Sequence, residues 1–258
     1  MPDGRWLPAT ALILATIAAG GCGKGQYRPS TTRRPSASRP ALRSSVESER
    51  DRAGHPVTPP RARAFGHAVN LSLVDIPGAT LAPDRRSPEP EDRETRRCGG
   101  AVSDAGAVQI KSPDFVRGVA LTREAISSRV TVLSSGRLAR ASVTSLGRPS
   151  WLACYERVLR RRFAGGGSSG VRVDTVTVSR VPVALAAVGA DMFGIRILAR
   201  LTSLRSRLSI NLYLDVFGFA LGPADIDLDA TSYVQPVANR TEQDLLRLMY
   251  LRALAHPL

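Results

Sequence analysis

The stretch Leu208-Ser-Ile-Asn-Leu-Tyr-Leu-Asp-Val216 decides the fold class of this chain of 258 residues. Apolar side chains occupy every second position from Leu208 to Val216, and Tyr213 and polar side chains stand between them. A period of two with one apolar face is typical of a strand in an antiparallel sheet whose other face meets solvent. Gly218 separates this predicted strand from the residues that follow.

The same alternation continues outward from this stretch. Residues 193–201 and 226–230 repeat it, and in the second of these Asp225, Asp227 and Asp229 flank the apolar positions. Side chains on one face of a strand stand about 7 Å apart. We therefore expect the three carboxylates to lie on a solvated sheet face rather than to converge on a calcium ion. Further strands are predicted at 171–178, 128–133 and 69–73, and the turn sequence Asp75–Gly78 ends the last of these.

Helices are expected to cover the buried face of this sheet. One is predicted at 138–146. A longer helix begins at Pro149, because proline is favoured in a first helical turn, and Gly165 ends it. The last helix begins at Asn239, which has Glu242 three positions later in the pattern of a capping box. The chain therefore predicts an α+β fold: a single domain with an antiparallel sheet, helices packed on one face, and a C-terminal helix.

The N-terminus carries a targeting signal. An apolar run from Leu7 to Ala19, too short to span a bilayer, is followed by two glycines and Cys22. This end is similar to the lipobox of bacterial lipoproteins, whose usual form is Leu-Ala-Gly-Cys, although Ala19 stands where leucine is commonest. The similarity implies cleavage before Cys22, acylation of its thiol, and a lipid anchor on the outer face of the cell membrane. The alternatives are a secretory signal cut near Ala19 and a buried helix with an incidental cysteine.

The positive charge of the chain is unevenly distributed. The formal net charge is +14, and residues 23–63 hold ten Lys and Arg against three Asp and Glu. This stretch lacks Ile, Phe and Trp, so it cannot bury enough apolar surface to fold. We expect a signal peptide at 1–21, a disordered basic tether at 22–63, one domain at 64–258, and a surface loop at 83–97. A basic tether next to a lipid anchor is expected to bind anionic lipid headgroups. Because the chain lacks aromatic stacking platforms, we expect no nucleic-acid partner.

The order of elements in the middle of the chain resembles a known family. A strand at 128–133 and a helix precede a second helix that carries Trp151-Leu-Ala-Cys154. This arrangement resembles actinobacterial envelope domains of the type found outside the cell in mycobacterial serine/threonine kinase H and in related lipoproteins, in which the helix bears Trp-x-x-Cys. The resemblance covers about residues 69–255. It implies a curved antiparallel sheet with helices packed on it, a PsbP-like sandwich, and a cleft for an unidentified ligand.

The three cysteines agree with an exported protein. With Cys22 acylated, Cys98 and Cys154 remain as an even pair in an oxidising compartment, and we predict that they form a disulfide. The kinase H domain has two disulfides, whereas the two cysteines of this domain allow only one. Two free thiols would instead fit a cytosolic protein.

Other motifs favour structural interpretations. The run from Gly165 to Gly170 has the spacing of a nucleophile elbow and of a dinucleotide-binding loop. Both need a strand before and a helix after, and the order here is reversed, so we interpret the run as a flexible connection. The end of the predicted helix at Pro149 is crowded with cations that complement the helix dipole, and a contact with an anion or a phospholipid headgroup is the alternative. These cations are Arg157, Arg160, Arg161 and Arg162.

The sequence predicts binding rather than catalysis. The three histidines, His55, His67 and His256, have no metal-ligand spacing to a cysteine, an acid or one another, so we expect no metal or cofactor. We expect a non-catalytic, sensor-like domain that binds a small or lipidic ligand or an envelope protein. The alternatives are a hydrolase of envelope polymers, whose carboxylates meet only in the fold, and a structural interaction module without a pocket.

Overall fold

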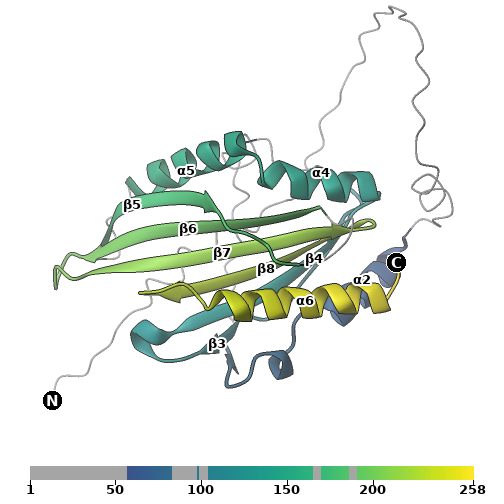
Figure 1. Cartoon of the computed structure of the whole chain (residues 1–258), viewed down its shortest axis with the longest axis horizontal. Helices are drawn as coiled ribbons and strands as arrows, with labels where there is room; N and C mark the ends of the chain where they lie inside the picture. Colours follow the sequence, from purple (N-terminus) through teal and green to yellow (C-terminus); the bar gives the residue numbers. More distant parts are fainter. Residues whose placement is uncertain (1–56, 83–97, 99–103, 165–169, 186–190) are drawn as a thin grey trace, which may run out of the picture.

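Figure 1 shows the domain as one sheet with helices beside it. The computed structural model describes residues 57–82, 98, 104–164, 170–185 and 191–258. The described helices are α2 (Pro59–Val69), α4 (Gly136–Leu146), α5 (Pro149–Ala164) and α6 (Asn239–Ala255), with the short 3-10 helices η3 (Leu73–Asp75) and η4 (Ala120–Thr122).

The strands form an eight-stranded antiparallel sheet with open edges. Their order is β1-β3-β4-β8-β7-β6-β5, and β2 pairs with the part of β4 that β3 leaves free. The predicted α+β class, the antiparallel sheet and the C-terminal helix are therefore confirmed. The strands are β1 (Thr80–Leu81), β2 (Val108–Lys111), β3 (Phe115–Arg117), β4 (Glu124–Val132), β5 (Val171–Arg180), β6 (Met192–Ser203), β7 (Ser209–Leu221) and β8 (Ala224–Tyr233).

Helices pack on both faces of the sheet, so the prediction of one covered face is wrong. Alternate residues of β7 belong to two separate buried clusters. Leu214 and Val216 pack in the cluster that contains residues of α4 and α5, whereas Phe217 and Phe219 pack with residues of α2 and α6. Because neighbouring residues of a strand point to opposite faces, the two helix pairs lie on opposite sides of the sheet.

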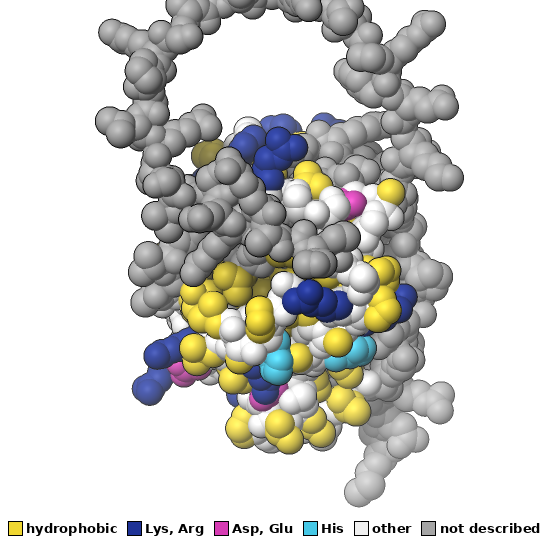
Figure 2. Space-filling view, turned by 90° about the vertical axis from the view of Figure 1, so that its right-hand side faces the viewer, with side chains coloured by type: hydrophobic (Ala, Val, Ile, Leu, Met, Phe, Trp, Pro, Cys, Tyr) yellow, Lys and Arg dark blue, Asp and Glu magenta, His cyan; other side chains and the backbone are white. Residues whose placement is uncertain are grey.

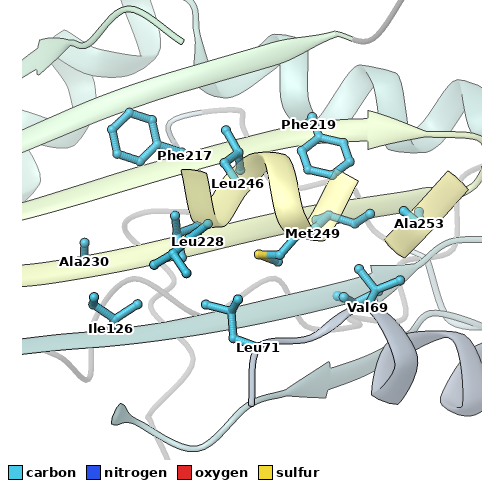
Figure 3. Packing of buried hydrophobic residues seen from close by; sticks show 14 of the residues in the cluster. Val69, Leu71, Ile126, Phe217, Phe219, Leu228, Ala230, Leu246, Met249 and Ala253 are labelled. Atoms are coloured by element: carbon cyan, nitrogen blue, oxygen red, sulfur yellow. The ribbon is translucent and has the colours of Figure 1, made fainter. Parts of the chain in front are cut away.

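The larger apolar cluster lies between the sheet and the helices α2 and α6. Figure 3 shows side chains from β4, β7 and β8 meeting those of the two helices and of the segment that follows α2. Leu246 and Met249 of α6 and Val69 of α2 are completely buried here. Full burial of such side chains contributes about 1.5–3 kcal/mol each, so this cluster fixes α6 and α2 on the sheet.

Strand β7 continues through Gly218, where the sequence predicted its end. The residues after Val216 are apolar on both faces, because both faces are covered at this end of the sheet. A Cβ atom on Gly218 would lie 2.3 Å from the ring of Phe193 and 2.6 Å from Asp227 Oδ1. Glycine at this position therefore makes room for two side chains of the neighbouring strands.

Helix α2 begins before residue 64, the expected start of the domain. Helix α2 starts at Pro59 and buries Ala62 and Phe65, while the sequence assigned its first turns to the tether. Proline at the first helical position and one apolar stripe are enough for a helix that is stabilised by the sheet below it. The strand predicted at 69–73 is wrong, because α2 ends at Val69 and a 3-10 turn follows.

A tight turn connects β8 to the last helix. Val234 has a φ angle of 69°, and the amide of Gln235 donates to the carbonyl oxygen of Tyr233 over 2.8 Å. Helix α6 then begins at Asn239, as predicted, but its cap residue is Ala238 and no side chain caps it. The predicted capping role of Glu242 is therefore wrong, and this carboxyl group serves elsewhere.

Candidate functional site

One face of strands β5, β6 and β7 extends past the first residue of α6 (Figure 1). Directly opposite residues of paired strands share a face, so Arg200 stands beside Asn211 and Tyr213 lies in the next row. Arg200 is exposed, and Asn211 and Tyr213 are half-buried. We name this surface the basic sheet face, and it includes Thr177, Arg196, Leu198, Arg200, Asn211 and Tyr213.

Contacts within the basic sheet face orient its aromatic ring. The guanidinium of Arg196 lies 5.9 Å from the centroid of the Tyr213 ring, and the side-chain amide of Asn211 donates to the Tyr213 hydroxyl over 3.3 Å. Arg196 is itself held by Asp215. Within the described parts of the chain Arg200 forms no ion pair. The face therefore offers a positioned aromatic ring and the exposed guanidinium of Arg200.

One of the four arginines of α5, Arg160, is bound to neighbouring groups. Arg160 donates to the carbonyl oxygen of Val176 over 3.0 Å and pairs with Glu156 at 2.8 Å. Glu156 in turn accepts from the backbone amide of Val178 over 2.9 Å. The two side chains thus bind backbone groups of β5, which is the edge strand of the sheet. The other three arginines of the predicted group, Arg157, Arg161 and Arg162, are exposed.

A disulfide joins α5 to the segment before β2. It connects Cys98 to Cys154, the pair expected from the sequence, across a Cα–Cα distance of 5.6 Å. Trp151, three residues earlier on α5, stacks on Tyr155 with ring centroids 4.7 Å apart. The expected lipidation residue, Cys22, lies outside the described residues, as do the predicted loop at 83–97 and all of the glycine-rich run except Gly170.

The three aspartates of β8 are not on a solvated face, and this expectation from the sequence is wrong. Asp225 and Asp227 are 7% and 4% exposed, and Asp229 is half-buried. Their face of β8 is the one against which α4 packs, and Arg129 of β4 lies directly opposite Asp227. Arg129 donates to Asp227 Oδ2 from Nε over 3.0 Å and from Nη2 over 2.6 Å.

The helix α4 contributes a hydroxyl to this acidic row, which we name the β8 cluster (Arg129, Ser142, Asp225, Asp227 and Asp229). Ser142 donates to Asp225 Oδ2 over 2.7 Å. Burial and then the charge of Asp227 raise the pKa of Asp225 to about 8. Burial also raises the pKa of Asp229, to about 6, against the opposing charge of Arg129.

A second buried ionic group lies on the opposite face, under the first turn of α6. Arg196 of β6 binds both oxygens of Asp215 of β7, from Nε over 2.6 Å and from Nη2 over 2.7 Å. Glu242 of α6 faces this pair and is 1% exposed. Burial and then the charge of Asp215 raise the pKa of Glu242 to about 9. We name these three residues the α6 cluster.

One end of the domain is largely apolar. Figure 2 shows hydrophobic side chains with arginine and histidine between them at the end where α2 and the last turns of α6 lie. Leu251 and Leu254 of α6 are exposed. Among the described residues no group of three or more His, Cys, Asp and Glu could hold a metal ion. The helices of the described segments include none with the length and apolar character needed to cross a membrane.

Comparisons with solved structures show a likeness to an extracellular domain. No protein-family model matches the sequence, and no curated protein matches it. The chain is similar to the solved extracellular domain of PknH from Mycobacterium tuberculosis, with a TM-score of 0.30 and 9% sequence identity. The match covers 77% of this chain and 97% of that chain. The resemblance predicted from Trp151 and Cys154 is thus confirmed, at a level that carries no statement about ligand or location.

Proposed function

We propose that this chain is a membrane-anchored extracytoplasmic lipoprotein with a non-catalytic binding domain. The anchor is supported by the apolar run from Leu7 to Ala19 that leads to Cys22, and by the basic composition of the stretch that follows. The disulfide between Cys98 and Cys154 supports an oxidising compartment, because such bonds rarely persist in a cytosol.

The observation that carries the binding role is the basic sheet face. Arg200 is exposed without an ion pair among the described residues, and Tyr213 presents an aromatic ring close to the Arg196 guanidinium. An aromatic ring offers apolar contact to a sugar ring, and a guanidinium pairs well with carboxylate or phosphate groups. The formal charge of +14 attracts polyanions at long range. The ligand class that fits these groups is an acidic polysaccharide of the cell envelope.

A hydrolase is the less supported function, although the fold does bring carboxylates together. Catalytic acids need contact with substrate in an accessible cleft. Asp225, Asp227 and Glu242 are all less than one tenth exposed, and each lies between the sheet and a helix. Their surroundings therefore favour a role in joining helices to the sheet over a role in hydrolysis.

The anchor is tested by metabolic labelling in a bacterial host. The full chain should incorporate labelled palmitate and fractionate with membranes, and a Cys22→Ser variant should do neither. Full-length, unlabelled chain among the cytosolic proteins would overturn this part of the proposal.

The binding role is tested with polygalacturonate as the probe, titrated calorimetrically into the full chain in detergent. Arg200→Gln and Tyr213→Ala should each weaken binding about tenfold, the loss of one charged hydrogen bond or one ring contact. The control, Arg161→Gln, removes the same charge from an exposed position on α5 and should leave the affinity unchanged. Equal weakening by the control, or absence of binding, would overturn the acidic-polysaccharide assignment. Binding of anionic vesicles in its place would indicate a lipidic ligand.

A further inference from the structure

Buried oxygen atoms without a hydrogen-bond donor mark both ionic clusters. Within the described part of the chain, Asp225 Oδ1, Asp227 Oδ1 and both carboxyl oxygens of Glu242 are enclosed and have no partner. Buried polar atoms are nearly always paired, so such orphans call for a missing donor. We propose that each cluster binds one proton, which the carboxyl of Asp225 donates to Asp227 and the carboxyl of Glu242 donates to Asp215.

The first proton site lies within the β8 cluster. The two carboxyl groups are on the same face of β8, two residues apart, and a hydrogen bond between them is one of the causes that raise the pKa of Asp225. Their Oδ2 atoms are occupied, by the Ser142 hydroxyl on Asp225 and by the Arg129 guanidinium on Asp227. The Oδ1 atoms of both groups lack a donor, as does Oδ1 of Asp229 in the same cluster. One proton on Asp225 Oδ1, donated to Asp227 Oδ1, satisfies both atoms at once.

The second proton site lies within the α6 cluster. Asp215 is 1% exposed and binds Arg196 with both oxygens, so its negative charge is compensated. A hydrogen bond to Asp215 is one of the causes that raise the pKa of Glu242, and within the described residues Glu242 forms no ion pair. A protonated Glu242 can donate to a remaining lone pair of Asp215, which an ionised Glu242 cannot do. The proton therefore provides the polar contact between the first turn of α6 and β7.

The acids around each site outnumber the cations that face them. At the first site, Asp225, Asp227 and Asp229 of β8 face Arg129 of β4, and α4 contributes the uncharged Ser142. The charge of Lys111 of β2 lowers the pKa of Asp229, and the charge of Asp114 raises it. At the second site, Glu242 and Asp215 of β7 face the cation Arg196 of β6, and the more distant Glu124 of β4 is paired with Arg117 of β3.

An excess carboxylate in either place would be a buried charge without a partner, which is costly. Protonation removes that charge at each site. The raised pKa values of Asp225, about 8, and of Glu242, about 9, agree with this assignment.

The two proton sites make stability depend on pH. In the unfolded chain these carboxyls have ordinary pKa values of 3.8 and 4.5. Between those values and the raised ones, the folded chain holds two protons that the unfolded chain has released, so stability falls as the pH rises. The stabilisation is complete below the ordinary pKa and is lost above about 8 for Asp225 and about 9 for Glu242.

The proposal is tested by urea unfolding of the full chain between about pH 6.5 and about pH 8, above the pKa of Asp229. Each site should raise the unfolding equilibrium constant about tenfold per pH unit in this range. Asp225→Asn and Glu242→Gln keep the shape and supply a permanent amide donor in place of the proton. Each substitution should remove one site's contribution to the pH dependence of the unfolding equilibrium constant. In the double variant this constant should not change with pH over the range.

The matched control is Asp244→Asn, which neutralises a carboxylate on the same helix whose side chain is 69% exposed. It should keep the wild-type slope. A flat wild-type profile, or amide variants that keep the wild-type slope, would overturn the proposal. Because the wild-type profile is decisive by itself, the test holds even where a variant does not fold.

Discussion

The two faces of the sheet hold their helices by different means. Under α2 and α6, large apolar side chains such as Phe217, Phe219 and Met249 fill the interface, and the helix α6 contributes the buried acid Glu242. Under α4, the acids belong to β8, their cation Arg129 belongs to β4, and the helix contributes only the hydroxyl of Ser142. Both faces nonetheless contain an arginine–aspartate pair next to a second buried acid.

This difference shows which contacts depend on the helices. The Arg129–Asp227 pair of the β8 cluster joins two strands of the sheet, so it stays formed even when α4 shifts. The α6 cluster exists only while α6 is docked, because Glu242 is part of that helix. We therefore expect the stability of the sheet to depend most on Arg129. We expect the docking of α6 on the sheet to depend most on the proton of Glu242.

The largest effect should come from removing the cation of one face. Arg129→Met leaves the buried carboxylates of β8 without a counter-ion and should lower the free energy of unfolding by about 3–5 kcal/mol. Arg196→Met should have a smaller effect, because the Arg196 side chain is 26% exposed and that of Arg129 is 11% exposed. Urea unfolding at neutral pH measures both, and equal losses would contradict this ranking.

The disulfide should stabilise only the α5 side of the molecule. Replacing Cys98 and Cys154 by serine opens a loop with a sequence separation of 56 and should lower the free energy of unfolding by about 2–4 kcal/mol. Hydrogen exchange should increase in α5 before it increases in α6, whose contacts lie on the other face. Equal, simultaneous loss of protection in both helices would show that the two faces unfold as one unit.

A smaller effect is expected from the hydroxyl that α4 contributes. Ser142→Ala removes the donor to Asp225 Oδ2 and should cost about 1–2 kcal/mol, because a buried acceptor is left unsatisfied. Ser150→Ala, at an exposed position in α5, is the control and should change stability little. A loss as large as that of Arg129→Met would show that α4 is as essential to the β8 cluster as the cation.

The smallest effect on stability concerns the edge strand. Glu156→Ala frees the Val178 amide on β5 and should cost less than about 1 kcal/mol. Exposed edge groups can pair with another chain, so light scattering should detect more self-association than for the wild type. A variant that stays as monodisperse as the wild type would show that the Glu156–Arg160 pair is not needed to protect this edge.

Much of this architecture could be predicted from local patterns. The alternation from Leu208 to Val216 gave β7, the apolar stripe after Pro149 gave α5, and Asn239 marked the start of α6. The short strands β1, β2 and β3 were missed, because segments of two to four residues with few buried side chains have no periodic signal. The first turns of α2 were missed because proline and arginine resemble linker composition.

The ionic clusters could not be predicted, because they depend on pairing between distant strands. Asp225, Asp227 and Asp229 alternate with apolar residues as solvent-facing residues do, and only the pairing with Arg129, 98 positions away, explains their burial. The spacing of Glu242 from Asn239 also matches a capping box, so nothing in the sequence indicated that Glu242 is buried against the sheet. One local signal was available: the continuous apolar run after Val216 indicates a strand covered on both faces, and a strand paired with it is then also buried.

The most direct test of the shared protons is infrared difference spectroscopy of the full chain near neutral pH. Our account predicts the carbonyl stretch of two protonated, buried carboxyl groups. One component should disappear in Asp225→Asn and the other in Glu242→Gln. A neutral-pH spectrum without a protonated-carboxyl band, or a band that survives both substitutions unchanged, would contradict it.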